Sequence, residues 1–156
     1  SVSCAWVELD GVPLLAYARQ QSLVATSTAE AEFYAMSGAA VELLGASSIL
    51  QELKVPYVAL LRTDSSSGRS LAQRHGLGKQ KHLDVRYLWL QEVIAGKRLQ
   101  LASVKGVANP ADVGTKCITS SHLRELWPLL KLQAEGVSIN PERDGGRASD
   151  CSGAQR

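Results

Sequence analysis

The sequence has few cysteines, and those it has are far apart. Cys4, Cys117 and Cys151 are three in number and include no Cys-x-x-Cys pair. This odd number and wide spacing favour neither a zinc site nor a disulfide framework, because both need cysteines in paired arrangements. Unpaired cysteines are typical of a reducing compartment, and we therefore expect an intracellular protein.

The sequence also lacks a long apolar run and a strong net charge. No uninterrupted apolar stretch reaches the roughly 18 residues that a membrane span requires, and no signal-peptide pattern opens the chain. We therefore expect no membrane partner. Seventeen Lys and Arg residues against 15 Asp and Glu give a net charge of +2. This mild basic bias permits nucleic-acid binding without requiring it.

What the chain does contain is typical of one soluble globular domain. Its 156 residues are 45% apolar and 21% charged, which is enough to build a buried core. No internal repeat is visible. From Gly136 the composition shifts to Gly, Ser, Asp and Arg. We therefore assign a domain to residues 1–132 and predict a disordered tail over residues 133–156.

Hydrophobic periodicity predicts the element order β-β-β-α-β-α-α-β-α. The first 26 residues indicate antiparallel strands, with Asp10-Gly11 as a hairpin turn and residues 22–26 as a short third strand. A long helix follows, capped by Ser27 or Thr28. A turn is expected at 65–68, strands at 58–64 and 98–104, and helices at 69–76, 82–96, after Asn109-Pro110, and at 118–133. This order predicts an α/β fold with a mixed sheet flanked by helices.

Three acidic residues stand where such a sheet could gather them. Glu32 lies near the start of the long helix, Asp64 ends a predicted strand, and Asp112 lies near the start of a later helix. Carboxylates that lie close together repel one another, and a bound Mg²⁺ or Mn²⁺ ion offsets this repulsion. A pair of such ions can catalyse phosphodiester hydrolysis. Spacing alone equally fits plain structural roles. Helix starts favour acidic residues, and Asp64 could cap the Ser-rich turn.

Four sequence blocks in order carry a resemblance to a known family. They are STAEAEFYAMSGAAVE, RTDSSSGRSLAQ, KQKHLDVRYLWLQEVIAGK and VANPADVGTK. Together they resemble the ribonuclease H domain of copia-type LTR-retrotransposon Pol polyproteins, over about residues 1–118. The resemblance implies a ribonuclease H-like fold, a five-stranded mixed sheet flanked by helices. It also implies metal-dependent hydrolysis of the RNA strand of RNA–DNA hybrids.

The resemblance assigns catalytic and metal-binding roles to three carboxylates. They are Glu32, Asp64 and Asp112, which would hold two Mg²⁺ or Mn²⁺ ions. Glu30 also matches a family position. The small residues Ala35 and Ala39 share a helix face with Glu32, however, so that this face can press closely on a sheet, which favours Glu32 as the ligand.

The family's first catalytic aspartate has no counterpart in this sequence. In the family it lies on a central first strand, upstream of the segment that matches Ser1–Trp6, and Asp10 is no substitute because it lies in a predicted turn. We therefore expect an N-terminally truncated domain that lacks this strand and has impaired activity. The alternative is a catalytically dead remnant that only binds nucleic acid or its polymerase neighbour.

Basic residues are the candidates for substrate binding. The proposed phosphate contacts are Lys79, Lys81, His82, Arg86 and Lys116, with Lys105 also near the Asp112 segment. A solvated basic surface, or a structural hydrogen bond from His82, would explain them equally well. The resemblance implies an RNA–DNA hybrid and the reverse transcriptase domain of the same polyprotein as partners. It also implies a location in a cytoplasmic retrotransposon particle or in the nucleus.

Overall fold

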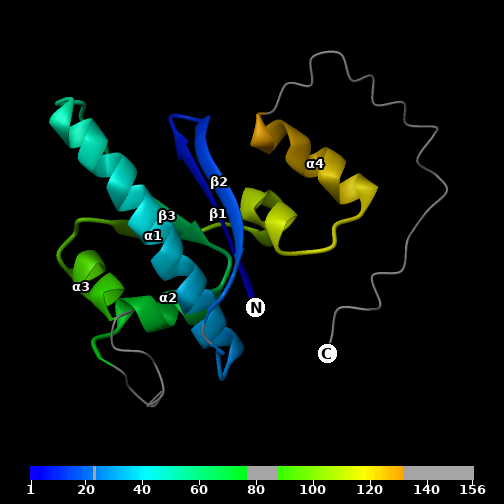
Figure 1. Cartoon of the computed structure of the whole chain (residues 1–156), viewed down its shortest axis with the longest axis horizontal. Coiled ribbons are helices and arrows are strands. Elements are labelled where there is room, and N and C mark those ends of the chain that lie inside the picture. The colour runs from blue at the N-terminus through cyan, green and yellow to red at the C-terminus, as the bar shows by residue number, and fades with distance from the viewer. Residues whose placement is uncertain (23, 77–87, 132–156) are drawn as a thin grey trace.

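The chain folds into helices and two small sheets, a mixed α/β architecture (Figure 1). The computed structural model describes residues 1–22, 24–76 and 88–131. The elements in these ranges are β1 (Val2–Leu9), β2 (Val12–Gln20), α1 (Thr28–Glu52), β3 (Leu60–Thr63), α2 (Ser66–Gln73), α3 (Trp89–Ala95), β4 (Gln100–Ser103), the 3-10 helices η2 (Gly106–Ala108) and η3 (Pro110–Gly114), and α4 (Ser120–Leu130).

The first two strands form an antiparallel hairpin, as the sequence predicts. Asp10 and Gly11 both adopt positive φ, at 49° and 76°. This is the conformation that the tightest hairpin turns require, and it explains why Asp-Gly is a strong turn signal. The register shifts between Val7 and Glu8, where β2 carries one extra residue, so the hairpin bends there.

The long helix α1 is locked at its start by side-chain caps. Ser27 is the N-cap, and its hydroxyl accepts a hydrogen bond from the backbone N–H of Glu30 at 3.2 Å. The Glu30 carboxylate in turn accepts bonds from the N–H and the hydroxyl of Thr26, both at 2.7 Å. These reciprocal bonds resemble a capping box and satisfy donors that a helix start would otherwise leave unpaired.

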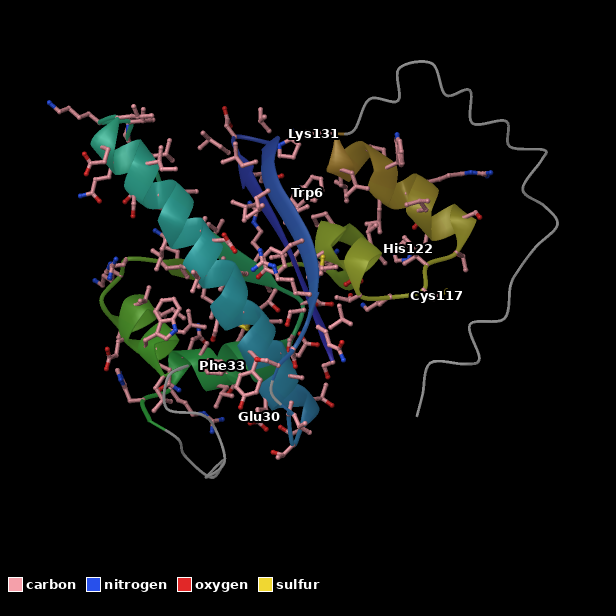
Figure 2. The ribbon with its side chains drawn as sticks, viewed as in Figure 1. Trp6, Glu30, Phe33, Cys117, His122 and Lys131 are labelled. Atoms are coloured by element: carbon pink, nitrogen blue, oxygen red, sulfur yellow. The ribbon has the colours of Figure 1, made fainter. Side chains whose placement is uncertain are left out.

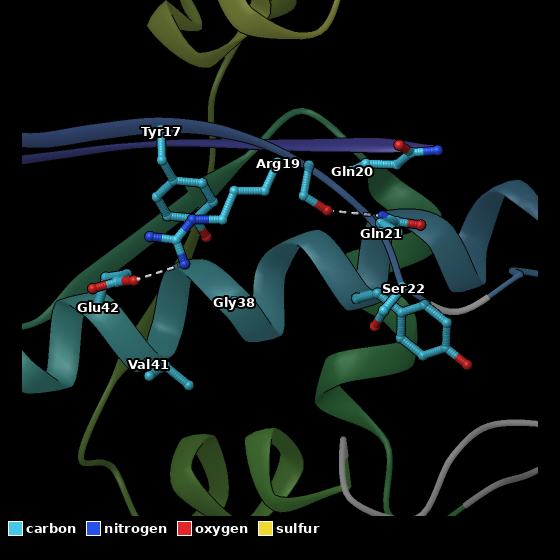
Figure 3. A pocket seen from close by; sticks show the side chains of 10 residues that line it. Tyr17, Arg19, Gln20, Gln21, Ser22, Gly38, Val41 and Glu42 are labelled. Carbon is cyan, nitrogen blue, oxygen red and sulfur yellow. Dashed lines mark hydrogen bonds and ion pairs between the residues drawn. The ribbon is translucent and has the colours of Figure 1, made fainter.

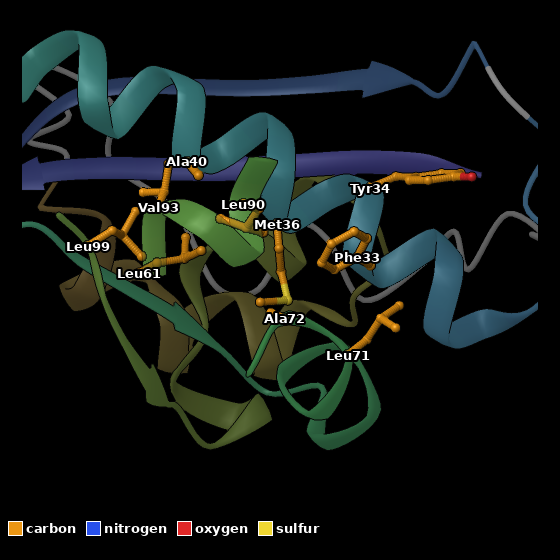
Figure 4. Packing of buried hydrophobic residues seen from close by; sticks show 10 residues of the cluster. All are labelled: Phe33, Tyr34, Met36, Ala40, Leu61, Leu71, Ala72, Leu90, Val93 and Leu99. Atoms are coloured by element: carbon orange, nitrogen blue, oxygen red, sulfur yellow. The ribbon is translucent and has the colours of Figure 1, made fainter. Parts of the chain in front are cut away.

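The inner face of α1 builds the hydrophobic core (Figure 4). By length and composition alone, α1 would also pass as a membrane span. Core helices pass the same test, and α1 contacts both β1 and β3. The buried cluster consists of Phe33, Tyr34, Met36, Ala40, Leu61, Leu71, Ala72, Leu90, Val93 and Leu99.

The second sheet is a parallel pair. Strands β3 and β4 run in register from Leu60↔Gln100 to Thr63↔Ser103. Parallel neighbours need a crossover connection, and α2 and α3 lie within it. Consequently both strands end at the same edge of the sheet, and the segments that follow them start from nearby points.

η3 lies against both strands of the hairpin, and α4 packs on η2 and η3 (Figure 1). Gly114 at the end of η3 lies directly against the hairpin. A Cβ placed there would come within 2.5 Å of Cys4 Sγ and 3.1 Å of Ala18 Cβ. Only glycine permits this approach, so this contact fixes the segment that carries Asp112 against the sheet.

Several predicted elements differ from those observed. Ser22 and residues 24–26 form no strand, because Thr26 is engaged in the cap of α1. The predicted turn at 65–68 is instead the start of α2, because Ser65 accepts a hydrogen bond from the N–H of Gly68 at 3.0 Å. The segment after Asn109 is a 3-10 helix, and α4 ends at Leu130 rather than at residue 133.

The predicted single mixed sheet is also not what the structure contains. β1 is hydrogen-bonded to β2, and β3 to β4, as two separate pairs, and no described strand joins them. Of the helix predicted at 82–96, the described part is Trp89–Ala95. The predicted tail at 133–156 lies outside the described residues.

Candidate carboxylate site

Asp64 stands at the carboxyl edge of the parallel sheet, directly after β3. It is exposed, and the adjacent backbone is held by a bond from the Val104 N–H to the Thr63 carbonyl at 3.1 Å. The chain after β4 returns to this same edge. A Cβ placed on Gly106 would lie 3.4 Å from Asp64 Oδ2. The end of β3 and the start of η2 are therefore in contact.

Glu32 approaches the same edge from α1. It is half-buried beside the first turn of α2, where a Cβ on Gly68 would lie 3.3 Å from Glu32 Cβ and 3.1 Å from Ser65 Oγ. Burial raises the pKa of the Glu32 carboxyl, and the negative charge of Asp64 raises it further. The Lys116 ammonium opposes this effect, and Asp112 adds a smaller increase of the pKa. Glu32 therefore lies within electrostatic reach of both aspartates.

Asp112 is the buried member of the set, with 5% of its surface exposed. Asn109 caps η3 by accepting a bond from the N–H of Ala111 at 3.2 Å, and its side-chain amide reaches Asp112 Oδ1 at 3.4 Å. The other carboxylate oxygen, Oδ2, accepts a bond from Lys116 Nζ at 2.6 Å. Asp112 is thus oriented by groups on both sides.

Lys116 supplies the positive charge of the site. Its hydrogen bond to Asp112 raises the pKa of its ammonium, whereas partial burial lowers it. The charges of Asp112, Asp64 and Glu32 all raise this pKa as well. One ammonium is therefore bonded to Asp112 and within electrostatic reach of Asp64 and Glu32, and the three carboxylates come from η3, the end of β3 and α1.

The donor chemistry of this site fits a hard divalent cation. Carboxylate oxygens are the preferred ligands of Mg²⁺ and Mn²⁺, and neither histidine nor cysteine is needed. The distances do not form a finished chelate, however. Among residues 1–22, 24–76 and 88–131, no group of three His, Cys, Asp or Glu side chains lies close enough together to hold a metal ion.

Glu30, the alternative to Glu32, has a structural role. Glu30 is only 4% exposed near Phe33 at the start of α1 (Figure 2), and its carboxylate accepts hydrogen bonds from Thr26 and from the Tyr34 hydroxyl. None of these partners belongs to the carboxylate site. The two acidic residues, two positions apart, therefore have separate surroundings.

The predicted substrate-binding residues are only partly described. Lys79, Lys81, His82 and Arg86 lie within 77–87, outside the described residues. Lys105 is exposed just before η2. Lys116 was expected to contact phosphate, but its ammonium is bound to Asp112.

Three features of this region were not anticipated from the sequence. Asn109 orients Asp112, and Gly68 and Gly114 permit the close approach of neighbouring segments. The signal for Asn109 was available, because Asn before Pro is a helix-start pattern whose side chain points into the first turn. The glycines had no such signal, because their role depends on contacts far along the chain.

A separate pocket of about 330 Å³ lies between β2 and α1 (Figure 3). The Arg19 guanidinium stacks 4.2 Å from the centre of the Tyr17 ring and pairs with Glu42 at 3.4 Å. These charged groups therefore already have partners within the fold. The sequence analysis did not identify this pocket.

Comparison with known proteins gives one relevant similarity. No family model matches the chain, and no solved structure matches it. The chain is 34% identical over 102 residues to the retrovirus-related Pol polyprotein from transposon TNT 1-94 of Nicotiana tabacum. The match covers 63% of the chain but only 8% of that polyprotein. This similarity supports a retrotransposon Pol origin for the chain.

Proposed function

We propose that this chain is a ribonuclease H-like domain of a retrotransposon Pol polyprotein. Its reaction is metal-dependent hydrolysis of the RNA strand of an RNA–DNA hybrid. The observation that carries the proposal is the approach of three acidic segments: Gly106, in the segment that leads to Asp112, lies against Asp64 Oδ2, and the charges of Asp64 and Asp112 raise the pKa of Glu32. The similarity to a Pol polyprotein supports the same origin for the chain.

In this proposal each carboxylate has a role set by its surroundings. Glu32, Asp64 and Asp112 hold the cations, which when bound supply positive charge to stabilise the transition state on the phosphate. Asp64 is exposed at the sheet edge and faces the solvent from which a hybrid would approach. Asp112 is buried, and Asn109 keeps its carboxylate in a fixed orientation.

A second function, a non-catalytic remnant that binds nucleic acid or its polymerase neighbour, is favoured by a different observation. Lys116 pairs with Asp112, and the described residues contain no group of three potential ligands within coordinating reach. A site whose buried aspartate is already paired with a lysine can be stable without a metal ion. Activity therefore has to be measured rather than assumed.

Cleavage of a labelled RNA–DNA hybrid in Mg²⁺ and in Mn²⁺ distinguishes the two functions. The test variant is Asp64→Asn. The matched control is Asp10→Asn, which makes the same change in the hairpin turn, where positive φ is well tolerated by asparagine. Each variant is measured beside the unmodified chain.

Metal-dependent cleavage that is lost in Asp64→Asn and kept in Asp10→Asn is the expected result. Cleavage that is equal in both variants would point to a contaminating nuclease. Absence of cleavage from every preparation, with hybrid binding retained, would establish the non-catalytic alternative.

A further inference from the structure

The ion pair between Lys116 and Asp112 joins a buried acid to an exposed base. Lys116 Nζ lies 2.6 Å from Asp112 Oδ2, and the side chains are 55% and 7% exposed. Asp112 is fixed by the backbone of η3 and by Asn109, whereas the lysine stem extends in from solvent. Of the two groups the ammonium is therefore the one that can move, because it can return to water without any change in the backbone.

Lys116 contacts Asp112 directly, and the charges of Asp64 and Glu32 also act on its ammonium. Gly106, six residues before Asp112, lies against Asp64 Oδ2, and the Cβ of Glu32 packs against Gly68. Three carboxylates and one ammonium leave a net negative charge when all four are ionised. An uncompensated group of carboxylates is costly, so the lysine stabilises the arrangement.

We propose that Lys116 is an internal counter-ion that competes with divalent cations for Glu32, Asp64 and Asp112. A dication then binds only when the ammonium leaves Asp112, because two positive charges at one carboxylate repel each other. The inference rests on the proposed function, since it takes these carboxylates as the cation site.

The first test is Mn²⁺ binding to the full chain, followed by the electron paramagnetic resonance signal of free Mn²⁺. The variants are Lys116→Gln, which removes the charge, and Lys116→Arg, which keeps it. The matched control is Lys105→Gln, which removes an exposed lysine from the same segment. Circular dichroism establishes that each variant is folded.

We expect Lys116→Gln to lower the Mn²⁺ dissociation constant at least fivefold. Lys116→Arg and Lys105→Gln should stay within twofold of the unmodified chain. Equal or weaker binding by a folded Lys116→Gln variant would overturn the inference while leaving the proposed function intact. Binding by Lys116→Gln alone would support the inference even if the unmodified chain proved inactive.

A second test needs no variant, in case Lys116→Gln does not fold. The rate of acetylation of each lysine is measured by mass spectrometry with and without Mg²⁺. Release from Asp112 should raise the rate at Lys116 at least threefold and leave Lys105 unchanged. An unchanged or slower rate at Lys116 in saturating Mg²⁺ contradicts the competition. Absence of cation binding by the unmodified chain and by Lys116→Gln rejects the inference together with the metal site.

Discussion

Glu30 and Glu32 lie two residues apart in α1 but contact different parts of the molecule. The Glu30 carboxylate is buried and accepts hydrogen bonds from Thr26 and Tyr34. Glu32 instead lies beside Gly68 and senses the charge of Asp64. One acid therefore stabilises the helix start, and the other belongs to the carboxylate site.

This difference predicts unequal effects on stability. Glu30→Ala should lower the free energy of unfolding by about 2–3 kcal/mol, because it removes charged hydrogen bonds and leaves the Tyr34 hydroxyl without this acceptor. Glu32→Gln should cost little, because it removes a charge repelled by two aspartates. Urea denaturation of both variants measures the two effects. Equal losses would show that Glu32 also supports the fold.

The raised pKa of Glu32 predicts how stability depends on pH. The folded-state pKa is above its ordinary value of 4.5, so the folded protein retains a proton that the unfolded chain has released. The stabilisation linked to this proton is fully present below the unfolded-state pKa and is lost as pH rises through the folded-state pKa. Glu32→Gln should abolish this decline above about pH 4.5. Urea denaturation from pH 4 to 7 tests it, and an identical decline in the variant would refute the assignment.

Substitution of two glycines, Gly68 and Gly45, tests the close approach between α1 and α2. A Cβ on Gly68 would lie 3.0 Å from Met36 Sδ, 3.1 Å from Ser65 Oγ and 3.3 Å from Glu32 Cβ. Gly68→Ala should therefore destabilise the protein by about 1 kcal/mol, despite the better helix propensity of alanine. Gly45→Ala is the control, since nothing lies within 4 Å of its Cβ position. It should stabilise α1 by up to about 1 kcal/mol, and thermal unfolding compares the two.

The Lys116–Asp112 pair should show measurable energetic coupling. We expect a coupling free energy of about 1–2 kcal/mol from a double-mutant cycle with Lys116→Gln and Asp112→Asn. The pair should be worth more than a surface salt bridge and less than a fully buried one, because Lys116 is exposed and Asp112 is buried. The free energy of unfolding is measured for all four proteins at low salt. A coupling near zero would mean that the ion pair is not maintained in solution.

Local signals explain which elements the sequence predicted. The Asp10-Gly11 turn and the Ser27 cap depend only on neighbouring residues, and both predictions are confirmed. The third strand was wrong because Thr26 has a local alternative, its bonds to Glu30. The separation of the strands into two pairs could not be foreseen, because strand pairing depends on contacts between distant segments.

The candidate site was likewise predictable only where the element order or a local pattern indicated it. Asp64 and the segment of Asp112 meet because parallel strands end at one edge, which the element order already implied. The ion pair between Lys116 and Asp112 was not predicted, although the i,i+4 spacing of the two residues was a usable signal for it. The burial of Asp112, which gives that pair its importance, comes from packing on the hairpin and has no local signal.

Hybrid cleavage by Glu32→Gln tests the proposed nuclease site most directly. The matched control is Glu42→Gln, which makes the same change on the same helix at a residue paired with Arg19. If the three carboxylates act together, Glu32→Gln should reduce Mn²⁺-dependent cleavage at least 100-fold, and Glu42→Gln should leave it within threefold. Equal cleavage by the two variants would contradict a catalytic role for the carboxylate site.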